Sequence, residues 1–122
     1  MPKVILVVDD ESIVVDISKR KLEERRYEVM TASNGQEALD CLKSKIPDLI
    51  LLDVNMPDMN GYTFIIEKDK TPEYVNIPVV MLTASHETQR LFERHRVKGY
   101  LLKPLKLQDL FDKVLQVAGP PD

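Results

Sequence analysis

The sequence predicts an α/β domain built on an open, doubly wound sheet of five parallel strands. Short segments rich in Val, Ile and Leu recur along the chain, and segments of roughly 10–16 residues with helical spacing separate them. A barrel of eight such units needs about 250 residues. A chain of 122 residues is too short for that barrel and has the length of one domain with a single core.

The candidate strands are apolar runs, and most of them do not alternate apolar with polar residues. Such runs are typical of parallel strands that helices cover on both faces. Right-handed crossovers would connect them. We expect strands at Val4–Val8, Tyr27–Thr31, Leu49–Leu52, Val79–Leu82 and Tyr100–Leu102.

The segments between the strands have apolar residues at helical spacing. In the first, Ile13, Ile17 and Leu22 lie roughly on one face, and the second follows the cap candidates Ser33 and Asn34. Lys68 and Asp69 stand in the third, where apolar residues would help to cover the sheet. The other apolar residues of these helices are Ala38, Leu39 and Leu42 in the second, Tyr62, Phe64, Ile65 and Ile66 in the third, Leu91 and Phe92 in the fourth, and Leu107, Leu110, Phe111, Val114 and Leu115 in the fifth.

Composition excludes several classes of protein. The chain has 17 basic and 20 acidic residues, so a generally basic surface for nucleic acid is excluded. No apolar run approaches the ~20 residues of a bilayer span, and the beginning of the chain does not resemble a signal peptide. The single cysteine, Cys41, cannot form an internal disulfide. We therefore expect a cytoplasmic protein.

Polar and charged residues follow four of the predicted strands. Asp9–Glu11 follow the first strand, Asp53 the third and Thr83 the fourth, while Lys103 and Pro104 follow the fifth. In doubly wound sheets, sites form beyond the carboxyl ends of the strands. Two carboxylates ~4 Å apart repel by about 4 kcal/mol at an effective dielectric constant of 20, so this cluster must bind a cation or hold a proton.

The oxygen ligands of this cluster suit Mg²⁺ or Mn²⁺, which also bind phosphate oxygens. The ammonium of Lys103 and the hydroxyl of Thr83 would supply donors for an incoming oxyanion. The combination of an acidic pair, a separate carboxylate, a hydroxyl and a lysine at one sheet edge points to phosphoryl chemistry.

These segments resemble the receiver domains of two-component response regulators, of the single-domain chemotaxis-regulator type, over essentially the whole chain. The resemblance rests on Ile5–Glu11, Pro47–Pro57, Asn60-Gly61, Pro78–Ala84 and Tyr100–Pro104. It implies a flavodoxin-like fold with strand order 2-1-3-4-5. It also implies a receiver domain over residues 1–118, with 119–122 as a C-terminal tail or the start of a linker.

The resemblance further implies that Asp53 accepts a phosphoryl group from a phosphohistidine in a Mg²⁺-dependent reaction. Asp10 and Asp53 would bind Mg²⁺ directly, with the backbone carbonyl of Asn55 as the third protein ligand, and Asp9 would act through a water. The donor would be a sensor histidine kinase or a phosphotransfer protein. The domain would be a signalling module rather than an enzyme.

The other implied residues concern the response to phosphorylation. Lys103 would pair with phosphoryl oxygens, and its peptide bond to Pro104 would be cis. Thr83 would bond to another phosphoryl oxygen, and Tyr100 would turn inward, which remodels the face formed by the fourth helix, fifth strand and fifth helix. That face would bind a downstream effector or an output domain. The domain itself would bind neither membrane nor nucleic acid.

Three alternative functions share part of this pattern, and the sequence disfavours the first two. An aspartyl-nucleophile phosphatase also uses a strand-end Asp and Mg²⁺, but it needs a general acid where this chain has Asn55. A nucleotide- or flavin-binding module would need a glycine-rich loop after the first strand, where this chain has Asp9 and Asp10. A receiver-like scaffold that docks without phosphorylation is also compatible, since residues 94–99 lack the small-residue turn often found there.

Overall fold

The computed structural model describes residues 2–56, 58–84 and 97–122. Five parallel strands form one sheet in the order β2-β1-β3-β4-β5, so the predicted flavodoxin-like fold is confirmed. The strands are β1 (Val4–Val8), β2 (Glu28–Ala32), β3 (Leu49–Asp53), β4 (Val79–Thr83) and β5 (Gly99–Leu102). The second strand begins one residue later than predicted.

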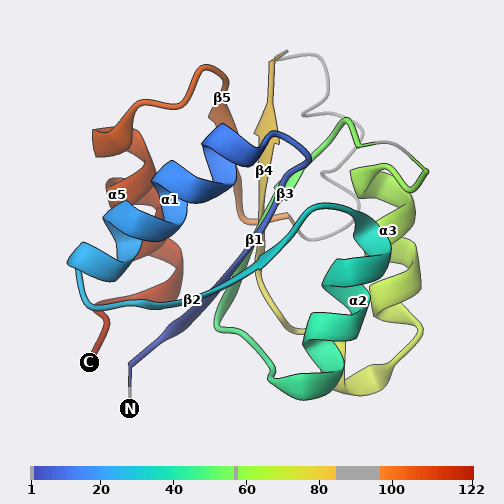
Figure 1. The fold of residues 1–122 in the computed structure, drawn as a ribbon. Coiled ribbons are helices and arrows are strands. Elements are labelled where there is room, and N and C mark those ends of the chain that lie inside the picture. The colour runs from blue at the N-terminus through green and yellow to red at the C-terminus, as the bar shows by residue number, and fades with distance from the viewer. Residues whose placement is uncertain (1, 57, 85–96) are drawn as a thin grey trace.

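The helices form a layer on each face of the sheet. Helices α1 (Ser12–Glu24) and α5 (Leu107–Ala118) cover one face, and α2 (Gly35–Ser44) and α3 (Gly61–Asp69) cover the other (Figure 1). A 3₁₀ turn, η1 (Pro72–Tyr74), follows α3. The predicted fourth helix with Leu91 and Phe92 lies outside the described residues. None of the described helices is long and apolar enough to cross a bilayer.

The central strands are buried on both faces, which explains their continuous apolar sequence. In β1, Ile5 and Val7 pack in the core under α1 and α5, whereas Leu6 and Val8 pack in the core under α2 and α3. Successive side chains of a strand point to opposite faces, so each run of apolar residues supplies two cores.

Helix α1 differs from its sequence prediction. Ser18 and Leu22 are its buried residues, and Val15 packs against the same core. Ile13 and Ile17 are instead 71% and 44% exposed. The residues that face the core, at positions 15, 18 and 22, follow the 3.6-residue period of a helix. Ile13 and Ile17 therefore lie on a neighbouring face of α1.

Local hydrogen bonds explain where α2 begins and why α3 carries a lysine. The Asn34 side chain accepts from the Glu37 N–H at 2.8 Å and caps α2, as predicted. Lys68 is buried in α3, and its Nζ donates to Asp69 at 2.7 Å and to the Tyr74 carbonyl at 2.9 Å. This lysine therefore connects α3 to η1.

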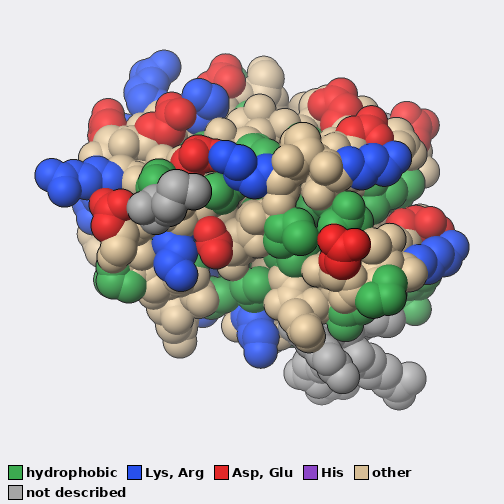
Figure 2. All heavy atoms as spheres, turned by 90° about the horizontal axis from the view of Figure 1, so that it is seen from below, with side chains coloured by type: hydrophobic (Ala, Val, Ile, Leu, Met, Phe, Trp, Pro, Cys, Tyr) green, Lys and Arg blue, Asp and Glu red, His purple; other side chains and the backbone are tan. Residues whose placement is uncertain are grey.

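Both ends of the chain lie at the end of the sheet where the strands begin (Figure 1). The Lys3 N–H donates to the Pro121 carbonyl at 2.7 Å, and the Tyr27 hydroxyl donates to the Gly119 carbonyl at 2.8 Å. Figure 2 views the molecule from this end. Basic and acidic side chains are interspersed there, and no broad basic area is visible on that face.

Candidate functional site

The carboxyl ends of the central strands bring the predicted acidic residues together. Asp53 is the last residue of β3, and Asp9 and Asp10 follow β1, which lies beside β3 in the sheet. Asp9 and Asp53 are 0% and 4% exposed, whereas Asp10 is exposed to solvent. Two carboxylates of this cluster are therefore removed from water, and the third lies at its surface.

The acidic cluster fits a hard divalent cation. Asp9, Asp10 and Asp53 each have a carboxylate oxygen within 4.8 Å of the others. Asp9 Oδ2 is buried and has no hydrogen-bond donor of suitable geometry among the described residues. A set of three neighbouring carboxylates, two of them buried, is the kind of donor set that Mg²⁺ or Mn²⁺ binds.

Lys103 reaches the same cluster from the segment after β5. Its Nζ lies 2.8 Å from Asp9 Oδ2, 2.7 Å from Glu11 Oε1 and 3.5 Å from Asp53 Oδ1. Its backbone N–H donates to the Thr83 carbonyl at 2.8 Å, which ties the segment to the end of β4. The peptide bond between Lys103 and Pro104 is cis.

The cluster perturbs the ionisation of Asp53 and Lys103. Burial, together with the negative charge of Asp9, raises the pKa of Asp53 from 3.8 to about 7, although Lys103 opposes the rise. Burial alone would lower the pKa of Lys103. The nearby carboxylates of Asp9, Glu11 and Asp53 outweigh this effect, so the pKa of the ammonium is raised. Lys103 is therefore a permanent cation beside a carboxyl that resists ionisation.

The remaining predicted site residues lie on neighbouring elements. The Asn55 N–H donates to Asp53 Oδ1 at 3.3 Å, so the backbone after β3 folds over the carboxylate. Thr83 is buried at the end of β4. Tyr100 is half-buried in β5 beside Met81 of β4, and it packs against the core under α2 and α3.

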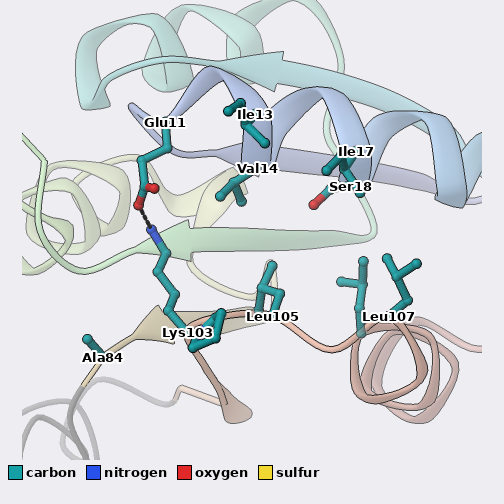
Figure 3. A pocket seen from close by; sticks show the side chains of 11 residues that line it. Glu11, Ile13, Val14, Ile17, Ser18, Ala84, Lys103, Leu105 and Leu107 are labelled. Carbon is teal, nitrogen blue, oxygen red and sulfur yellow. Dashed lines mark hydrogen bonds and ion pairs between the residues drawn. The ribbon is translucent and has the colours of Figure 1, made fainter.

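Glu11 is in contact with the site, although the sequence reasoning assigned it no separate role. Its carboxylate accepts a hydrogen bond from Lys103 Nζ at 2.7 Å across a separation of 92 residues (Figure 3). This contact lies at one end of a cavity of about 610 Å³ between α1 and the segment after β5. Ile13 and Ile17 line one side of the cavity and Leu107 the other.

Known proteins resemble this chain in both sequence and structure. The family model for the response regulator receiver domain matches residues 5–115. An uncharacterized 14.6 kDa protein of Leptolyngbya boryana is 35% identical over 97% of this chain and 93% of its own length. The probable transcriptional regulator ycf27 of Porphyra purpurea is 36% identical over 97% of this chain. The chain spans 48% of that regulator and smaller shares of several other curated relatives.

Solved structures agree with this family. The chemotaxis protein CheY4 of Vibrio cholerae has a TM-score of 0.90 and 31% identity, and the match covers 96% of this chain and 99% of that one. The matched residues include the strand ends that form the acidic cluster. With the sheet order and the carboxylates beside Lys103, these matches show that the chain belongs to the family of response regulator receiver domains.

Proposed function

We propose that this chain is a phosphoacceptor signalling domain that takes a phosphoryl group on Asp53 from the phosphohistidine of a sensor kinase or phosphotransfer protein. One observation carries the proposal: Asp53 belongs to a cluster of three carboxylates within 4.8 Å, and Lys103 Nζ lies 3.5 Å from its Oδ1. The cluster provides ligands for a cation, and the lysine provides a donor for the transferred group.

The proposed metal is Mg²⁺, with Mn²⁺ as a substitute. Asp10, Asp53 and the backbone carbonyl of Asn55 are the proposed direct ligands, and Asp9 acts through a bound water. The metal supplies positive charge for the carboxylates and for the phosphoryl oxygens. The buried Oδ2 of Asp9, which has the Lys103 ammonium 2.8 Å away but accepts no hydrogen bond of suitable geometry, supports this assignment.

In the transfer itself, one carboxylate oxygen of Asp53 forms a bond to phosphorus. The bond between phosphorus and the donor's histidine nitrogen breaks at the same time. The electron pair of the broken bond stays on that nitrogen, which takes a proton from the solvent. Lys103 and the hydroxyl of Thr83 bind phosphoryl oxygens and hold the group in place.

The proposed response passes from Thr83 to Tyr100. Thr83 moves toward the new phosphoryl group, and Tyr100 turns into the space beside it. The half-buried position of Tyr100 in β5, the strand that pairs with β4, supports this step. The β5 and α5 part of the face then recruits a protein effector or regulates an output domain. The predicted fourth helix, which the proposal also assigns to this face, lies outside the described residues.

Phosphorylation tests the proposal directly. The intact mass of the protein is measured after incubation with acetyl phosphate, with and without Mg²⁺. We expect one added phosphoryl group that requires Mg²⁺ and is absent from Asp53→Asn. Asp16→Asn removes one exposed carboxylate from α1 and is the matched control, which should be modified like the unaltered protein.

A folded protein that takes no phosphoryl group would contradict the proposal and favour the docking scaffold that needs no phosphorylation. An adduct that persists in Asp53→Asn would place the acceptor elsewhere. Peptide mapping of the adduct distinguishes a modified Asp53 from any other modified residue.

A further inference from the structure

The Glu11–Lys103 contact has no place in the proposed transfer. Among the described residues, the hydrogen bond of Lys103 Nζ with suitable geometry goes to Glu11, at 2.7 Å. The buried Asp9 and Asp53 carboxylates lie near the same nitrogen, but these contacts are ion pairs without hydrogen-bond geometry. The ammonium therefore donates its hydrogen bond to the exposed carboxylate of Glu11, while it lies 3.5 Å from Oδ1 of the phosphoacceptor Asp53.

Glu11 is placed to hold the ammonium in this position. It is the residue before α1, at the N-cap position, yet its side chain makes no cap hydrogen bond. Its backbone N–H donates to Asp9 Oδ1 at 2.9 Å, so the start of the helix is fixed against the acidic cluster. The side chain is 59% exposed and is free to face Lys103, which is 16% exposed.

We propose that Glu11 is a positioning residue that competes with the phosphoryl group for Lys103 and so slows phosphorylation of Asp53. This inference rests on the proposed function of Asp53. In the unphosphorylated protein, Glu11 holds the ammonium at its exposed carboxylate. When the phosphoryl group arrives, Lys103 exchanges its bond to Glu11 for a bond to a phosphoryl oxygen, and no covalent bond of either side chain changes.

Two substitutions separate this role from general repulsion of an anionic donor. Glu11→Gln removes the charge, and Glu11→Asp keeps the charge but is one methylene too short to keep the 2.7 Å contact. If Glu11 acts by holding Lys103, both substitutions speed the reaction. If Glu11 only repels the donor, Glu11→Asp behaves like the unaltered protein. Asp16→Asn in α1 controls for the loss of one negative charge.

The measurement is the second-order rate constant for phosphorylation by acetyl phosphate at saturating Mg²⁺ and 0.5 M KCl, at which salt screens long-range charge effects to roughly 3–5 Å. We expect Glu11→Gln and Glu11→Asp to react about two- to five-fold faster, the effect that one exposed ion pair produces. Asp16→Asn should stay close to the unaltered protein.

A second readout does not depend on phosphorylation or on metal. In the metal-free protein, the ammonium protons of Lys103 are followed by NMR of isotopically labelled lysine. The bond to Glu11 slows their exchange with water, so both Glu11 variants should exchange faster, and Asp16→Asn should not. This spectrum also verifies that each variant is folded.

The possible failures are distinguishable. If the unaltered protein takes no phosphoryl group, the proposed function fails and this inference fails with it. If the protein is phosphorylated but Glu11→Asp reacts like the unaltered protein or more slowly, only the role of Glu11 is overturned. Unchanged proton exchange in both Glu11 variants would overturn it as well.

Discussion

The charge of Asp53 costs the folded protein free energy when no metal is present. Its pKa is raised from 3.8 to about 7 by burial and by Asp9. Between these values the folded protein keeps a proton that the unfolded chain has released, so stability falls as the pH rises through this window. The size of the pKa shift sets an upper limit of about 4 kcal/mol on this loss of stability.

We therefore predict that Asp53→Asn stabilises the metal-free protein at pH 8, by about 1–4 kcal/mol, and much less at pH 5. Urea denaturation in EDTA at the two pH values measures the free energy of unfolding. Adding Mg²⁺ at pH 8 should stabilise the unaltered protein more than the variant. The difference between their free energies of unfolding should therefore become smaller. If Asp53→Asn is stabilised equally at both pH values, the buried charge of Asp53 is not the cause of the stabilisation, and the prediction is wrong. Asp16→Asn is again the control.

At the site, the sequence predicted which residues meet but not how they bond. Parallel strands place their carboxyl ends at one edge of the sheet, so Asp9, Asp53 and Lys103 could be assigned to one cleft from strand positions alone. The bond between Glu11 and Lys103 joins residues 92 apart. No sequence pattern specifies which of several nearby carboxylates a flexible lysine contacts.

Lys68 stabilises the connection between α3 and η1. It is buried, and its Nζ bonds to Asp69 and to the Tyr74 carbonyl. We predict that Lys68→Met, which keeps most of the volume, destabilises the protein by about 1–3 kcal/mol, because it leaves a carbonyl and a carboxylate without their donor. Lys70→Met, which removes an exposed partner of Glu67, should change stability by less than about 0.5 kcal/mol.

Thermal and urea denaturation of the two methionine variants provide the comparison. An equal loss of stability in the two variants would show that the buried Lys68 contributes no more to stability than the exposed ion pair of Lys70 with Glu67. Phosphorylation by acetyl phosphate should be preserved in both, because Lys68 contacts α3 and η1 rather than the acidic cluster.

The elements differ in how well the sequence predicted them. Strands β1, β3 and β4 were predicted to within a residue because both of their faces are buried and their apolar runs are continuous. The buried face of α1 was assigned incorrectly because Ile13 and Ile17 have helical spacing but line a cavity. A polar residue, Ser18, occupies the buried face instead. Hydrophobicity alone does not tell a core face from the wall of a groove.

The last residues of the chain form hydrogen bonds with the rest of the domain. Bonds from Lys3 to Pro121 and from Tyr27 to Gly119 join them to the beginning of the chain and to the residue before β2. We predict that deleting residues 119–122 destabilises the protein by about 1–3 kcal/mol, the contribution of two partly buried hydrogen bonds.

Tyr27→Phe, which removes only the hydroxyl, should cost about 0.5–1.5 kcal/mol. Urea denaturation measures both variants, and the phosphorylation rate with acetyl phosphate should not change. A deletion with no effect on unfolding would support the boundary at residue 118 that the sequence suggested. A loss of phosphorylation would instead connect this end of the molecule to the acidic site.

The bond between Lys3 and Pro121 also affects how the protein can be handled in experiments. It holds both chain ends beside each other, at the opposite end of the sheet from Asp53 (Figure 1). An affinity handle or a fluorescent protein attached at either end would therefore leave the acidic cleft accessible. Immobilisation through one end on a biosensor surface would present the cleft to a kinase in solution, with the attachment point a full strand length away.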